Sequence, residues 1–290
     1  MKKANICVLG TILFFAVAIF SLSQEETVDK ATVSFSNPSK PGRIEASVHN
    51  GSITVKGYEG KEVIVEAKTS GRMIKELKIA KAFEEVKEKV KKLKKIGMRR
   101  ISSPGGTELE IEEEDNVIEV NVSSIKQTID LIIQVPYSTS LELSAHNNGD
   151  ITVENVNGEI EINHHNGALK LTGISGNVVA HTFNGDITVT LSKVNPEKPM
   201  SFSTWNGDID VTFPANIKAN VKMKSERGEI YSDFDIRLDK TPQRIVEDSR
   251  EEGGKYKISF QKHILGTING GGPEYQFNTY NGDILIRKAK

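Results

Sequence analysis

Flat side chains recur two positions before a series of turn glycines, and their type and spacing could do chemistry. They are His49, Asn147, His165, Phe183, Trp205 and Tyr280. If the glycines mark equivalent turns, these side chains form one outward column with members about 4.8 Å apart. The column could stack sugar rings or aromatic ligands, or it could stack on itself and stabilise the sheet.

Within this column, some residues are better candidates for ligand contact than others. The candidate ligand-binding residues are His165, Phe183, Trp205 and Tyr280. Trp205 is the only tryptophan of the chain, and we expect it to be the principal contact.

Four histidines fall close together, a density that could hold zinc or copper. His146 and His164 lie 18 residues apart and fall on the inward-leaning positions of their segments. His165 and His181 fall on the outward positions, so the four side chains are not expected to converge. We therefore predict no metal site and no cofactor.

Aspartates follow several of the same glycines and raise two further chemistries. Asp150, Asp186, Asp208 and Asp283 occupy the position after the glycine, but Ser52 and Ala168 interrupt that column. The interruptions argue against a calcium-binding β-roll. Asp186 and Asp208 could act as paired carboxylates of a carbohydrate-active enzyme, but no basic residue stands beside them. We predict a protein without catalytic residues.

The strands that would position these residues follow from a repeat in the sequence. Gly149, Gly158, Gly167, Gly176 and Gly185 are nine residues apart, and short alternating segments that are typical of half-buried strands separate them. A meander of hairpins or a solenoid with two corners per coil would both fit this period. Odd and even glycines have different neighbours, which favours the solenoid: an all-β stack of coils of about 18–22 residues, resembling a parallel β-helix.

Counting from the corner glycines also predicts a core. The second and fourth positions after each corner glycine are aliphatic in all six corners, so these side chains should point into the coil. They are Ile53, Val55, Ile151, Val153, Leu169, Leu171, Ile187, Val189, Ile209, Val211, Ile284 and Ile286.

Two segments interrupt the repeat. Residues 72–96 carry apolar positions at steps of three and four, which predicts one inserted amphipathic helix. From Arg72 to Arg100 there are 12 basic and 4 acidic residues, so this segment is either a face for membranes or anionic polymers, or a solvated surface. Residues 229–265 lose the corner pattern and predict an irregular insertion, with a return strand at 256–260.

The N-terminus and the composition bear on location and partners. Residues 1–23 have a basic start, an apolar stretch and small residues at the end, which predicts a signal peptide; an uncleaved membrane anchor is the alternative. A short leader (24–30) and a single repeat domain (31–290) would follow. A net charge of −1 argues against a nucleic-acid binder. The only cysteine, Cys7, lies in the apolar stretch, so the mature chain would have no disulfide.

The corners at 184–187, 206–209 and 281–284 all read Asn-Gly-Asp-Ile, and a glycine run at 270–272 precedes the last one. With these motifs, the chain over 31–288 resembles a family of exported bacterial domains of unknown function named as a putative adhesin. The resemblance implies a solenoid-like fold, a location in the periplasm or at the cell surface, and no established activity. The role expected from it is a non-catalytic envelope protein that presents a surface to a protein or a glycan. The alternatives are an envelope-stress or structural accessory protein near the membrane, and a carbohydrate-active enzyme.

Overall fold

The computed structural model describes residues 28–69, 107–125, 127–147, 149–239, 243–248, 256–261 and 263–290. The predicted signal peptide (1–23), the predicted helix (72–96) and the basic segment (72–100) lie outside the described residues. All regular elements within these ranges are β-strands. Among the described residues there is no helix that is long and apolar enough to cross a membrane. The prediction of an all-β chain is therefore confirmed for the described residues.

The strands follow one another along the chain with these bounds: β1 (Val28–Ser34), β2 (Arg43–Asn50), β3 (Ile53–Tyr58), β4 (Glu62–Thr69), β5 (Leu109–Glu114), β6 (Val117–Val122), β7 (Ile129–Pro136), β8 (Ser140–Asn147), β9 (Ile151–Glu154), β10 (Asn157–Asn166), β11 (Leu169–Asn184), β12 (Ile187–Lys193), β13 (Met200–Asn206), β14 (Ile209–Phe213), β15 (Ala219–Ser225), β16 (Ile230–Ser232), β17 (Ile236–Asp239), β18 (Gln243–Asp248), β19 (Tyr256–Gln261), β20 (Ile264–Ile268), β21 (Glu274–Asn281) and β22 (Ile284–Lys288).

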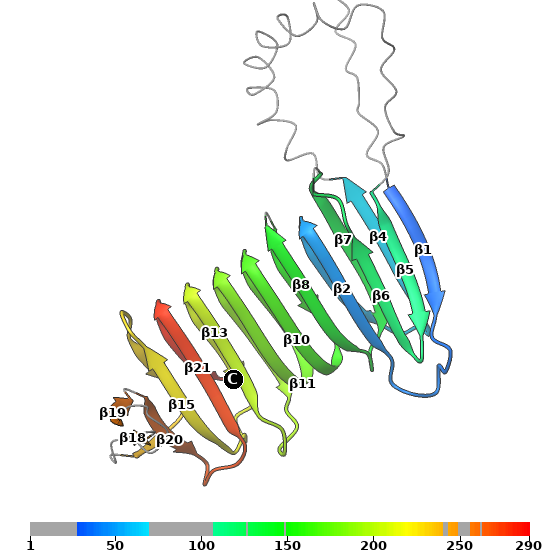
Figure 1. Ribbon diagram of the computed structural model, residues 1–290. Helices are drawn as coiled ribbons and strands as arrows, with labels where there is room; N and C mark the ends of the chain where they lie inside the picture. The colour runs from blue at the N-terminus through cyan, green and yellow to red at the C-terminus, as the bar shows by residue number, and fades with distance from the viewer. Residues whose placement is uncertain are drawn as a thin grey trace, which may run out of the picture.

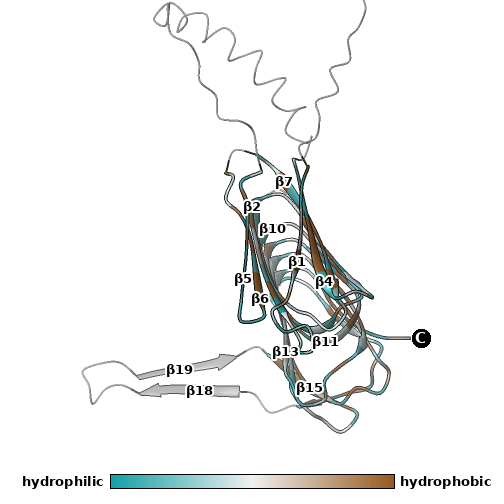
Figure 2. Cartoon of the chain, turned by 90° about the vertical axis from the view of Figure 1, so that its right-hand side faces the viewer, coloured by the Kyte–Doolittle hydropathy of each residue, from teal (hydrophilic) through white to brown (hydrophobic). Residues whose placement is uncertain are grey.

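The chain alternates between two faces as it advances. The first face is the parallel series β6, β2, β8, β10, the C-terminal half of β11, β13, β21 and β15 (Figure 1). The second face is the parallel series β7, β3, β9, the N-terminal half of β11, β12, β14, β22 and β16. Figure 2, which views the stack toward one end, shows the two faces on opposite sides of an elongated core. The fold is thus solenoid-like.

The pairing register agrees with the predicted repeat. Ile160 pairs with Val178 and Leu169 pairs with Ile187, each 18 residues on, whereas Ile187 pairs with Ile209 after a longer coil. All twelve aliphatic residues predicted from the corner glycines are buried. They form part of one continuous core, which several stacked coils share because one coil alone buries too little apolar surface.

The spatial order of the coils differs from their order in the sequence. The β2–β3 coil lies between β6–β7 and β8–β9, although β5, β6 and β7 follow it in the chain. The β21–β22 coil likewise lies between β13–β14 and β15–β16. The first and last coils of the repeat are therefore each inserted between two coils that follow one another in the sequence.

Antiparallel strands close both ends of the stack. β5 pairs with β6, and β1 and β4 extend the second face beyond β7. At the other end β20 pairs with both β15 and β17. β1 begins at Val28, so its first residues fall in the predicted leader 24–30.

The interval 229–265 contains regular strands where we expected an irregular insertion. β16, β17 and β20 join the large sheet, and β18 pairs with β19 in a separate two-stranded sheet. The expected return strand corresponds to β19. Because these strands pair antiparallel or lie at an end of the stack, they carry no corner spacing that the sequence pattern could reveal.

Candidate functional site

The outward column predicted from the sequence is a continuous stack of six rings at one corner of the coils. We call it the ring ladder: His49, His146, His165, Phe183, Trp205 and Tyr280. Neighbouring ring centroids lie 4.3 to 5.9 Å apart, and the ring planes differ by 3° to 23°. The guanidinium of Arg227 lies 5.2 Å from the centroid of Tyr280 and covers that end of the ladder. The four predicted ligand-binding residues all belong to the ladder.

One predicted member of the column is wrong. Asn147 pairs with Asn50, so it occupies the position directly before the corner glycine, and His146 takes the ring position instead. His146 stacks between His49 and His165, at 5.4 and 4.8 Å. The sequence count failed because two asparagines precede Gly149 where the other corners have one.

The ladder uses most ring faces for its own stacking. Parallel rings at these separations cover one another, which is the self-stacking arrangement. Ring edges remain accessible: Phe183 is 44 % and Trp205 47 % exposed. A ligand would therefore contact the edges of the rings. It would also contact any part of a ring face that the neighbouring ring, shifted sideways, does not cover.

An asparagine ladder runs beside the rings. Each side-chain amide donates to the side-chain oxygen of the preceding coil: Asn166 to Asn147, Asn184 to Asn166, Asn206 to Asn184, and Asn281 to Asn206, at 2.6 to 3.0 Å. The asparagine of the Asn-Gly corner therefore does more than tolerate a turn, because it ties each coil to the next.

The aspartates after the corner glycines bind backbone groups. Oδ1 of Asp186 accepts the backbone N–H of Asp208 at 2.9 Å, and Oδ1 of Asp208 accepts that of Asp283 at 2.8 Å. Asp150 accepts from Ala168 in the same way. The aspartates therefore link neighbouring coils through hydrogen bonds.

Sequence reasoning missed a row of buried polar side chains three positions before the corner glycines. Thr182, Thr204 and Thr279 each donate a hydroxyl to the glycine carbonyl of the preceding coil, at 3.0 to 3.2 Å. His164 takes this place one coil earlier, with Nε2 at 2.8 Å from the carbonyl oxygen of Gly149. Hydroxyls recurring at that one offset in the sequence could have indicated this role.

The histidines do not converge on a metal. His164 is buried, as its inward parity predicts, but His146 points outward into the ladder, contrary to the prediction. Among the described residues, no group of three His, Cys, Asp or Glu side chains could hold a metal ion. Burial lowers the pKa of His181, and the charge of Glu161 raises it in part.

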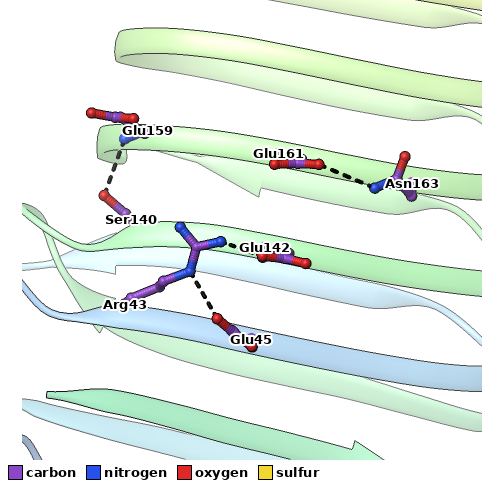
Figure 3. Close-up of polar contacts among 7 residues, drawn as sticks. All are labelled: Arg43, Glu45, Ser140, Glu142, Glu159, Glu161 and Asn163. Atoms are coloured by element: carbon purple, nitrogen blue, oxygen red, sulfur yellow. Dashed lines mark hydrogen bonds and ion pairs between the residues drawn. The ribbon is translucent and has the colours of Figure 1, made fainter. Parts of the chain in front are cut away.

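The first face beside the ladder is acidic over its N-terminal part. Glu45, Glu142 and Glu161 lie in register on β2, β8 and β10 (Figure 3). Arg43 bonds to both Glu45 and Glu142. Like charges on adjacent strands repel one another, and one arginine offsets this only in part.

The same row then loses its charge. Val179, Ser201 and Gln276 continue it on β11, β13 and β21, and Lys222 follows on β15. The first face thus has an acidic part on β2, β8 and β10, an uncharged stretch of this row on β11, β13 and β21, and a lysine on β15, with the ring ladder along one side.

Two hollows lie against the ring ladder on this face. An open hollow of about 490 Å³ adjoins its histidine half and is lined by residues that include His49, His146, His165 and His181. A second hollow of about 230 Å³ adjoins Phe183, Trp205 and Tyr280, and its lining includes Ser203 and Asn278. The predicted ligand-binding residues therefore divide between the two hollows, with His165 in the first and the other three in the second.

Parallel coils tied by these ladders define the described part of the chain as an all-β, solenoid-like repeat. The chain belongs to the Toastrack DUF4097 family, whose model matches residues 19–287. This confirms the expected relation to a family of unknown function.

Two solved structures are similar to the chain at low identity. One is described as a "putative cell adhesion protein" from Clostridium sporogenes, at 12 % identity and TM-score 0.41, covering 91 % of this chain and 100 % of its own. The other is described as a "putative adhesin" from Bacteroides fragilis, at 10 % identity and TM-score 0.35, covering 92 % of this chain and 98 % of its own. No curated protein matches the chain.

Proposed function

We propose that the chain is a non-catalytic protein of the bacterial cell envelope that binds a protein or glycan partner through its first face. The observation that carries this proposal is the ring ladder, which borders two hollows and leaves Phe183 and Trp205 about half exposed beside the smaller one. Large aromatic side chains in such positions are typical of binding surfaces. A β-solenoid of 18- to 22-residue coils is the architecture proposed for it, since the asparagine ladder links residues at these spacings.

Export is part of the proposal. The basic start and apolar stretch of residues 1–23 support a signal peptide, which would deliver the domain to the periplasm or the cell surface. The names of the two similar structures agree with an adhesive role.

A pull-down and a glycan array with the purified chain test the function. We expect at least one envelope protein or glycan to bind and Trp205→Ala to weaken that binding at least tenfold. Tyr231→Ala is the matched control, because Tyr231 is 55 % exposed on β16 of the second face, and it should leave binding unchanged. Trp205→Phe keeps a ring in the ladder and separates loss of contact from loss of stacking.

The proposal would be refuted by either of two results. One is that no envelope component binds the folded chain. The other is that Tyr231→Ala weakens binding as much as Trp205→Ala does, since the binding surface would then not be the first face.

A further inference from the structure

The hollow of about 230 Å³ beside Trp205 has the size of a subsite rather than of a complete pocket. Pockets that enclose a whole small molecule begin at about 300 Å³. A hollow below that size, open on the flat side of a sheet, suits one unit of an extended polymer whose neighbouring units continue along the face.

The ring ladder is most open at this hollow. Phe183 and Trp205 are parallel within 7°, but their centroids are 5.9 Å apart, the widest step of the ladder. If these ring planes are spaced like neighbouring strands, about 4.8 Å apart, that separation corresponds to a lateral offset of about 3 Å. Part of a ring face is therefore accessible at this step, and the negative face of an aromatic ring attracts the polarised C–H groups of a sugar ring.

Polar groups without a partner surround the open step. Ser203 on β13 and Asn278 on β21 pair in register on the first face and line the hollow. Neither side chain forms a hydrogen bond within the described ranges, and neither do Trp205 Nε1 or Tyr280 Oη. Together they offer an amide and two hydroxyls, which both donate and accept, and an indole N–H, which donates; this set matches the hydroxyl groups of a sugar.

Charge on the face favours an uncharged ligand. Lys224 and Glu226 line the same hollow and pair with each other at 2.7 Å, so they leave no net charge there. On the other side of the hollow the acidic row of Glu45, Glu142 and Glu161 would repel a polymer that carries carboxylates, sulfates or phosphates.

From these observations we infer that the first face over β11, β13, β21 and β15 binds a neutral, hydroxyl-rich glycan, with one pyranose unit in the hollow beside Trp205. Phe183 and Trp205 contact the C–H side of that unit, and Ser203 and Asn278 bond to its hydroxyl groups. The inference rests on the proposed function and names the ligand class for that surface.

Calorimetric titration of the purified chain with dextran, mannan and polygalacturonate tests the inference. We expect a neutral polymer to bind and the acidic polygalacturonate not to bind at low salt. Ser203→Ala combined with Asn278→Ala should weaken neutral binding at least tenfold. Ser144→Ala is the matched control, because Ser144 lies in the same row beside the histidine hollow, and it should change binding less than twofold.

The other outcomes show whether the inference alone fails or the proposed function fails with it. If only polygalacturonate or an envelope protein binds, and Trp205→Ala abolishes that binding, the function stands and the inference is overturned. Equal losses from Ser144→Ala and from the double variant would also overturn it. If neither polysaccharide nor any envelope component binds, both proposals fail.

Discussion

The corner glycines set how closely successive coils stack, and we predict Gly207 to be among the positions least tolerant of alanine. Its φ is +149°, and a Cβ added there would overlap the carbonyl oxygen of Gly185. The backbone strain alone is worth about 1–3 kcal/mol. Relief of the overlap requires the two coils to move apart.

That movement would stretch three interactions between the coils. They are the amide bond from Asn206 to Asn184 at 2.7 Å, the bond from the Asp208 N–H to Asp186 at 2.9 Å, and the hydroxyl bond from Thr204 to Gly185 at 3.0 Å. At about 0.5–1.5 kcal/mol each, their loss together with the strain brings the expected destabilisation of Gly207→Ala to about 2.5–7.5 kcal/mol.

Alanine variants of two other glycines measure the cost of backbone strain and the cost of steric overlap separately. Gly270 has a φ of +88° and no atom within 4 Å of an added Cβ, so Gly270→Ala should cost only the strain, about 1–2 kcal/mol. Gly158 has no positive φ, but its Cβ would overlap the carbonyl oxygen of Thr139, so Gly158→Ala should cost only the overlap.

Urea unfolding followed by far-ultraviolet circular dichroism measures all three variants. We expect Gly207→Ala to lose the most stability. If it loses no more than Gly270→Ala, contact between corner glycines does not set the coil spacing, and the reasoning is refuted.

Three further predictions concern single side chains. Tyr275 is fully buried, and within the described residues its hydroxyl has no hydrogen-bond partner; Tyr275→Phe should therefore raise the free energy of unfolding by about 1 kcal/mol, and an unchanged or lower urea midpoint would contradict this. Asn184→Asp removes the amide that donates to Asn166 and places two acceptor oxygens together, so it should cost about 1–3 kcal/mol in urea unfolding; a neutral effect would show that the asparagine ladder contributes nothing. Because burial lowers the pKa of His181, and Glu161 offsets this only in part, the unfolded chain takes up the proton first. The stability present above pH about 6.5 should therefore decline as the pH falls, and His181→Gln should lessen the decline measured between about pH 7.5 and about pH 5.

The sequence predicted those parts of the fold that repeat in it. Corner glycines, aliphatic pairs and the outward column follow one local rule, because each coil presents the same environment to the same positions. The rule failed at Asn147, where one extra residue before Gly149 shifted the count and moved the ring position to His146.

Other features depend on contacts between coils, and their local signal in the sequence does not name the partner. The donation from Thr204 to Gly185 joins residues 19 positions apart, and that from Thr279 to Gly207 joins residues 72 apart. The hydroxyl positions look like ordinary strand threonines until the carbonyl above them is known. The position of β2–β3 beside β8–β9 likewise follows from pairing between distant segments, which periodicity alone cannot specify.

The insertion of β21–β22 between β14 and β16 has a consequence for synthesis. A repeat protein whose coils lie in chain order can lengthen by adding each new coil to the exposed end. Here the Asn281 rung, which bonds to Asn206 across 75 residues, leaves the ribosome after β15 and β16, although its coil lies between them and β13–β14 in the stack. Until β21 and β22 are made, β13 and β14 have no neighbour on that side and β15 and β16 lack their parallel partners, so this part of the stack cannot assemble in chain order.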